Sequence, residues 1–166
     1  MTWGIPTDTF LQIHVILSLI GIASGFIVLY GLLTGNPLPA WTAIFLVTTI
    51  LTGVTGFPLA PFGFTPARVV GIILLILLAL AVVALYAFRL AGAWRPIYVV
   101  TAIMSLYLNV FVGVTQAFQK LSFLQPLAPT QSEPPFLIAQ LAVLLIFIVL
   151  GVLAVRRFHP APRASA

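Results

Sequence analysis

The sequence predicts an all-α, polytopic membrane protein in which five transmembrane helices form one bundle. Three observations lead to this prediction. Of the 166 residues, 62% are hydrophobic and only 5% are charged, which leaves too little polar surface for a water-soluble fold. Five apolar segments are each close to the roughly 20 residues that a helix needs to cross about 30 Å of hydrocarbon. Prolines and glycines separate these segments, as expected of connecting loops.

The five expected spans follow one another along the chain. They cover residues 10–33, 41–57, 69–88, 97–118 and 136–155. The second span is the shortest, because Pro37 and Pro39 precede it and proline does not continue the interior of a helix. The third and fourth spans are joined by residues 89–96 alone, which predicts a tight antiparallel hairpin. Residues 1–155 would form one domain, and the basic tail 156–166 would be disordered.

Basic and aromatic residues predict the orientation of the bundle. One side of the membrane would carry Arg89, Arg95, Arg156, Arg157 and Arg163, and the other side Arg68 and Lys120. Positive charge favours the cytoplasmic side, so we predict an outer N-terminus and a cytoplasmic C-terminus in the plasma or inner membrane of the cell. The aromatic residues at the predicted cytoplasmic boundary agree, and these are Tyr30, Trp41, Tyr86, Trp94 and Tyr98. The tail would touch anionic headgroups weakly.

Strongly polar side chains are expected in the outer half of the bundle, although they come from all five spans. Counting about 1.5 Å per residue from each outer boundary places seven of them there, namely His14, Ser18, Thr52, Arg68, Asn109, Gln116 and Gln140. The inner half is expected to be almost pure hydrocarbon. In the first span the polar residues share a helical stripe with Gly21 and Gly25, and in the fourth span with Gly113.

Two interpretations of these seven residues stay open. A polar side chain in hydrocarbon needs a hydrogen-bond partner, which a neighbouring helix or a bound ligand can provide. In the first interpretation the residues only hold helices together, each bond contributing about 0.6 to 2 kcal/mol. In the second they line an outward-facing cavity that binds a ligand. The outer loops 57–67 and 122–136 are rich in proline and poor in charge, and would either close this cavity as a lid or lie in the headgroups.

The composition excludes several other kinds of site. No cysteine is present and Asp8 and Glu133 are the only carboxylates, so no metal site is expected. His14 and His159 would lie on opposite sides of the membrane and form no haem pair, so His14 is a hydrogen-bonding, proton-handling or structural residue. No phosphate-binding loop, dinucleotide fingerprint or nucleophile elbow occurs, so neither catalysis nor a cofactor is expected. The basic residues form no stripe for nucleic acid.

One long segment is the most distinctive part of the sequence. It covers residues 94–136 and reads WRPIYVVTAIMSLYLNVFVGVTQAFQKLSFLQPLAPTQSEPPF. This segment resembles a family of small bacterial multi-span membrane proteins. The resemblance implies no activity, because that family has no assigned function. The translocator-protein family is similar in length and in its five spans, but its tryptophan- and proline-rich motifs do not occur in this sequence.

The sequence thus predicts a non-enzymatic membrane protein. Its outward-facing, polar-lined cavity would bind a small amphipathic or lipid-like molecule, or the protein would be an accessory subunit of a membrane complex. A small-solute or proton-coupled transporter or channel is the alternative. Membrane lipids are the expected partners, the apolar helices are compatible with a homo-oligomer or a partner membrane protein, and nucleic acid is not expected.

Overall fold

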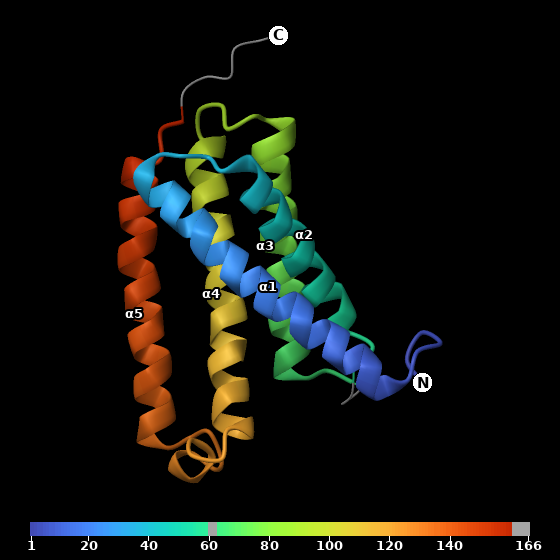
Figure 1. Cartoon of the computed structure of the whole chain (residues 1–166). Coiled ribbons are helices and arrows are strands. Elements are labelled where there is room, and N and C mark those ends of the chain that lie inside the picture. Colours follow the sequence, from blue (N-terminus) through green and yellow to red (C-terminus); the bar gives the residue numbers. More distant parts are fainter. Residues whose placement is uncertain (60–62, 161–166) are drawn as a thin grey trace.

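Five long helices make up the computed structural model, which describes residues 1–59 and 63–160 (Figure 1). The helices are α1 (Thr7–Thr34), α2 (Pro39–Gly56), α3 (Pro66–Val82), α4 (Trp94–Lys120) and α5 (Pro134–Arg157). A π-helical turn, η1 (Val83–Ala87), continues α3, and a 3₁₀ turn, η2 (Gln125–Leu127), lies between α4 and α5. The described residues contain no β-strand. The end of the predicted tail, residues 161–166, lies outside the described residues.

Each of these helices, with η1 counted as part of α3, is long and apolar enough to cross a membrane. The all-α fold is therefore confirmed, and so is the number of helices that could span a membrane by length and composition. Each expected span coincides with one helix, and the largest differences are at the starts of α1, α3 and α4. These first turns contain polar residues and prolines, which lower the local hydropathy although the helix has already begun. At α3, for example, Pro66 begins the helix and the Thr65 hydroxyl accepts a hydrogen bond from the Arg68 N–H at 3.3 Å.

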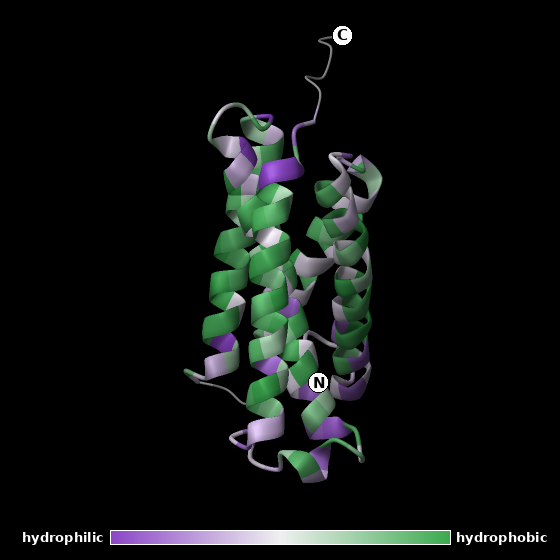
Figure 2. Ribbon diagram, turned by 90° about the vertical axis from the view of Figure 1, so that its left-hand side faces the viewer, coloured by the Kyte–Doolittle hydropathy of each residue, from purple (hydrophilic) through white to green (hydrophobic). Residues whose placement is uncertain are grey.

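The helices alternate in direction, so the bundle has two distinct ends (Figure 1). We call the end where α1, α3 and α5 begin the N-terminal end; it also carries the connections 57–65 and 121–133. The opposite end, where α1, α3 and α5 end, is the C-terminal end. The N-terminal end corresponds to the side predicted to face outward. Figure 2 shows hydrophilic residues concentrated towards both ends and hydrophobic residues along most of the helices between them.

The bundle packs most tightly from its middle to its C-terminal end. The central helix is α4, which contacts α1, α3 and α5, whereas α2 contacts α1 and α3. The main core includes the buried side chains of Leu32, Phe45, Leu78, Val99, Leu106 and Phe147. A small second cluster at the N-terminal end, formed by Phe118, Ala128 and Phe136, joins the end of α4 to the start of α5. The main core therefore holds the middle and the C-terminal end together, and a separate small cluster holds part of the N-terminal end.

One glycine of α1 lets two other helices come close. A Cβ atom added at Gly25 would lie 2.5 Å from a side-chain carbon of Leu106 of α4, so that one of the two would have to shift, and it would make a tight contact of 3.0 Å with the ring of Phe45 of α2. A Cβ atom added at Gly113 of α4 would instead meet Ile22 at 3.6 Å, an ordinary van der Waals distance. Small residues at such contacts let helix backbones approach one another. Gly25 therefore permits the close packing of α1 with α2 and α4.

The start of α4 holds the end of α5 at the C-terminal end of the bundle. Nη1 of Arg95 donates hydrogen bonds to the carbonyl oxygens of Val155 at 3.1 Å and Phe158 at 2.7 Å. The last carbonyls of a helix lack partners within the helix, so a cation there satisfies them and suits the helix dipole. Phe158 is buried, and its ring centroid lies 6.1 Å from that of Tyr98.

Two expectations about the C-terminal half of the bundle differ from the structure. Tyr98 was expected at the membrane boundary but is buried in the core, because the end of α5 folds over it. The same half was expected to be almost pure hydrocarbon, yet it contains the buried hydroxyls of Ser24, Thr42, Thr101 and Ser105. Each of these hydroxyls donates to a backbone carbonyl in or beside its own helix, which lets it enter an apolar region.

Candidate functional site

The seven predicted site residues differ in burial and in the contacts they make. Thr52, Asn109 and Gln140 are buried, His14, Ser18 and Arg68 are half-buried, and Gln116 is exposed. Six of them make one of four kinds of contact: a link between α1 and α2, bonds to the backbone, a link between α4 and α5, or an approach of polar groups to Gly21. A residue committed to packing is less available to a ligand.

His14 links α1 to α2 near the N-terminal end. Its Nδ1 lies 2.9 Å from Oγ1 of Thr55, whose hydroxyl donates to the carbonyl oxygen of Leu51 at 2.7 Å. Because the Thr55 proton is engaged there, its oxygen accepts the bond from Nδ1–H of His14. This leaves Nε2 as the ring nitrogen that can accept a bond or a second proton. Ser18 donates its hydroxyl to the carbonyl oxygen of His14 at 3.0 Å.

Thr52 and Arg68 bind the backbone. The Thr52 hydroxyl donates to the carbonyl oxygen of Thr48 at 2.8 Å, within the same helix. Nη2 of Arg68 donates to the carbonyl oxygen of Phe57 at 2.9 Å, which joins the start of α3 to the end of α2. Arg68 therefore helps to hold the connection that was predicted as one half of a lid. Residues 60–62 of that connection lie outside the described residues.

Gln140 links α5 to α4. Its Nε2 donates to the carbonyl oxygen of Phe111 at 3.0 Å and to Oγ1 of Thr115 at 3.1 Å. Its Oε1 has no hydrogen-bond partner among the described residues. An amide that bonds across two helices matches the packing interpretation, in which such a bond contributes about 0.6 to 2 kcal/mol.

Asn109 and Thr49 approach Gly21 from two different helices. The position of a Cβ atom added at Gly21 lies 3.0 Å from Oγ1 of Thr49 and 3.5 Å from Nδ2 of Asn109. Thr49 is 0% exposed and Asn109 is 6% exposed. Neither Oγ1 of Thr49 nor Nδ2 of Asn109 has a hydrogen-bond partner among the described residues. A buried polar group without a partner costs about 1 to 3 kcal/mol, so this contact brings together two costly polar groups from different helices.

Thr49 is absent from the seven residues that the sequence predicted. The signal was nevertheless present, because Thr42, Thr49 and Thr52 are spaced by seven and three residues and so share one face of a helix. All three are buried in the structure. What the sequence did not reveal is that Thr42 and Thr52 donate to backbone carbonyls whereas Thr49 does not.

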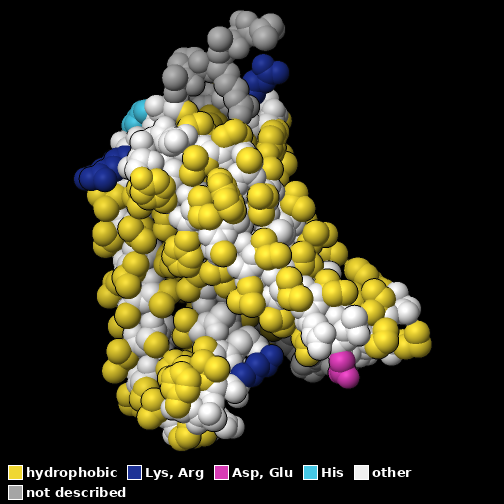
Figure 3. All heavy atoms as spheres, viewed as in Figure 1, with side chains coloured by type: hydrophobic (Ala, Val, Ile, Leu, Met, Phe, Trp, Pro, Cys, Tyr) yellow, Lys and Arg dark blue, Asp and Glu magenta, His cyan; other side chains and the backbone are white. Residues whose placement is uncertain are grey.

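Gln116 lies where α1 and α4 separate. One turn earlier on α4, Gly113 still faces Ile22 of α1. Further towards the N-terminal end α1 runs away from α4 and α5, and the space-filling view shows this face hollowed between them (Figures 1 and 3). Ser18 is one turn beyond Ile22 on α1, as Gln116 is beyond Gly113 on α4, so both border this open hollow. We call it the N-terminal hollow.

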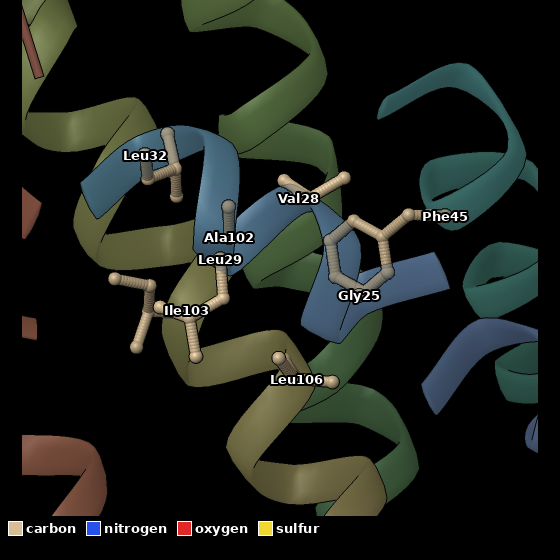
Figure 4. Close-up of a pocket in the computed structure, with 8 residues that line it drawn as sticks. All are labelled: Gly25, Val28, Leu29, Leu32, Phe45, Ala102, Ile103 and Leu106. Carbon is tan, nitrogen blue, oxygen red and sulfur yellow. The ribbon is translucent and has the colours of Figure 1, made fainter. Parts of the chain in front are cut away.

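Two small hollows in the described residues lie elsewhere. One is lined by Gly25, Val28, Leu29, Leu32, Phe45, Ala102, Ile103 and Leu106, and is too narrow for a water molecule (Figure 4). The other has a volume of about 40 Å³ and is lined by Pro37, Pro39, Thr42, Leu85 and Tyr86 at the C-terminal end. None of the seven predicted residues lines either one. An outward-facing site would therefore be the open N-terminal hollow.

The second predicted lid segment packs on the ends of α4 and α5. The rings of Phe118 and Phe136 meet edge to face with centroids 5.5 Å apart, beside the buried Ala128. The carboxylate of Glu133 accepts hydrogen bonds from the Thr130 hydroxyl at 2.8 Å and from a backbone N–H of the same segment at 3.0 Å. These contacts fix the segment beside one pair of helices.

Within residues 1–59 and 63–160, no group of three or more histidine, cysteine, aspartate or glutamate side chains is placed to hold a metal ion. Comparison of the chain with protein-family models, with curated proteins and with solved structures finds no match. The fold and the N-terminal hollow are therefore the basis for any functional argument.

Proposed function

We propose that the protein is a non-enzymatic integral membrane protein that binds a small amphipathic or lipid-like molecule in the N-terminal hollow. In this proposal the N-terminal end faces outward and the C-terminal end faces the cytoplasm of the plasma or inner membrane. The observation that carries the proposal is the separation of α1 from α4 towards the N-terminal end (Figure 1), at the end of α4 where Gln116 is exposed.

The border of the N-terminal hollow combines apolar and polar groups. On α1, Val15 is one turn from Ser18, and on α4, Val112 is one turn from Gln116; both valines are 38% exposed. The Gln116 amide can donate and accept hydrogen bonds, and the Ser18 oxygen retains lone pairs after its proton is donated to the backbone. Such a border suits a molecule with an apolar body and a polar group.

Asn109 lies deeper than Gln116 on the same stripe of α4. Its Nδ2 is buried against α1 and α2, so a ligand would reach this atom only after a shift of α1. Gln116 is therefore the amide that a ligand would meet first. We expect substitution of Gln116 to affect binding directly, and substitution of Asn109 to affect binding and helix packing together.

Close packing at the C-terminal half favours a binding role over a channel. Leu32, Phe45 and Leu106 are each at most 2% exposed, and the space between α1, α2 and α4 is too narrow for water. A permanently open channel would need a water-filled path through this region. The packing therefore supports a site that opens to one side of the bundle.

The proposal can be tested with a photoreactive lysophospholipid in lipid nanodiscs. Its diazirine acyl chain should label residues 109–120 of α4 and the first half of α1 in a saturable manner. Labelling of the lipid-facing side of α5, where Leu145 is 54% exposed, should instead rise in proportion to the probe. Saturation distinguishes a site from general contact with lipid.

Matched glutamine variants give the control. Gln116→Leu should abolish the saturable labelling, whereas Gln125→Leu, which removes an exposed glutamine from the turn between α4 and α5, should leave it unchanged. Labelling of α4 that stays proportional to the probe, or that is equal in the two variants, would contradict the proposal.

A further inference from the structure

The charged side chains are distributed unequally between the two ends of the bundle. The N-terminal end carries the basic residues Arg68 and Lys120 and both acidic residues of the chain, Asp8 and Glu133. The C-terminal end carries Arg89, Arg95, Arg156 and Arg157, and neither acidic residue. On the face shown in Figure 3, dark-blue side chains are visible near both ends, whereas magenta occurs only near the N-terminal end. The positive charge of the side chains is therefore concentrated at the C-terminal end.

Three of these four arginines are exposed on the surface of the bundle. Arg95 is half-buried, and its guanidinium donates to two carbonyl oxygens at the end of α5. Arg89, Arg156 and Arg157 are exposed. Because the guanidinium group is planar and always charged, it can bind a phosphate through two parallel hydrogen bonds. These three side chains are available for such a partner.

Exposed aromatic residues place the three arginines at the level of lipid headgroups. Tyr30 is 67% exposed, Trp41 is 43% exposed and Tyr86 is 54% exposed, and all three lie near the C-terminal end. Such rings favour the boundary between hydrocarbon and water. Arg89 follows Tyr86 within one turn, and Arg156 and Arg157 end α5. The guanidinium groups would thus stand beside phosphates.

We propose that the C-terminal end selects anionic phospholipids, whose phosphates bind Arg89, Arg156 and Arg157. The absence of any acidic side chain at this end removes the competing intramolecular partner. Each basic residue near an anionic surface strengthens binding about fivefold. Zwitterionic lipids gain less, because their own positive groups compete with the arginines. The proposal does not depend on the proposed function, since the N-terminal hollow lies at the other end.

Native tryptophans can report which lipids gather at this end. Trp41 and Trp94 lie near the C-terminal end, and Trp3 near the N-terminal end. In a Trp3→Phe background, brominated phosphatidylglycerol or brominated phosphatidylcholine would be mixed at increasing fractions into phosphatidylcholine vesicles that contain the protein. The quenching of fluorescence reports the fraction of each lipid beside the two tryptophans. We expect the phosphatidylglycerol to quench at a several-fold lower fraction, with a smaller difference at high salt.

Charge-neutral variants identify the residues responsible. The triple variant Arg89→Gln, Arg156→Gln and Arg157→Gln should remove the preference for phosphatidylglycerol. The control pair Arg68→Gln and Lys120→Gln removes two charges from the other end and should leave the preference intact. Equal quenching by the two lipids in the unsubstituted background, or an undiminished preference in the triple variant, would overturn the proposal. Circular dichroism of each variant checks that the helices are retained.

Discussion

Replacement of Thr49 by valine removes a hydroxyl that has no hydrogen-bond partner among the described residues. The side chain is 0% exposed, and valine has the same branched shape, so the substitution isolates the hydroxyl. A buried polar group without a partner costs about 1 to 3 kcal/mol, whereas hydrogen bonds measured between membrane helices contribute about 0.6 kcal/mol on average. We therefore expect Thr49→Val to raise the free energy of unfolding by about 0.5 to 2 kcal/mol.

Thr42→Val is the matched control on the same helix. Thr42 is 2% exposed, and its hydroxyl donates to the carbonyl oxygen of Pro37 at 3.0 Å. Its loss should lower the free energy of unfolding by about 1 kcal/mol, opposite in sign to the effect at Thr49. Unfolding in mixed detergent and SDS micelles, followed by tryptophan fluorescence, measures both. If Thr49→Val is as destabilising as Thr42→Val, the Thr49 hydroxyl has a partner, such as Asn109 or a ligand, and the reasoning fails.

Three other predictions follow from the packing and from the two ends of the bundle. Gly25→Ala should be less stable than Gly113→Ala by about 1 to 3 kcal/mol in the same micelle assay, because only the first places a methyl group 3.0 Å or less from side chains of two neighbouring helices. Equal stability of the two variants would contradict the packing argument. Arg95→Ala should lower the melting temperature and expose the end of α5 to protease, since two charge-assisted bonds are lost. Single cysteines at Thr130 and His159 should react with an impermeant reagent from opposite sides of intact vesicles, and reaction from one side would exclude five crossings.

The helices could be predicted closely because hydropathy alone identifies a membrane span. A segment such as residues 69–88 is almost entirely aliphatic, so its length and type follow from the roughly 30 Å of hydrocarbon it must cross. The π-helical turn Val83–Ala87 was not predictable, because it has the same apolar composition as the α-helical turns before it. The burial of Tyr98 was also not predictable, because it depends on where the end of α5 folds.

The candidate site could be predicted only as a set of polar residues. Their depth follows from counting along each span, but their partners depend on how far each helix is rotated about its axis. Gln140 and Gln116 are the same residue type at similar expected depths, yet one bonds to α4 and the other is exposed. The sequence contains no signal for this difference. The importance of Thr49 was missed because a threonine in a membrane helix usually bonds to its own backbone.

The choice between packing and binding is therefore different for each residue. Thr52 and Gln140 already have the backbone or interhelical bonds that the packing interpretation requires. Gln116 needs no hydrogen bond to another helix, because its amide is exposed and can bond to water or to lipid headgroups. Asn109 is the intermediate case, since its Nδ2 is buried and has no partner among the described residues. A ligand that bonded to Asn109 would recover the cost of that unmade bond. Ligand binding through Asn109 should therefore also raise the free energy of unfolding, beyond the gain expected from binding alone. Gln116 has no such unmade bond, so its bond to a ligand should add no such extra stability.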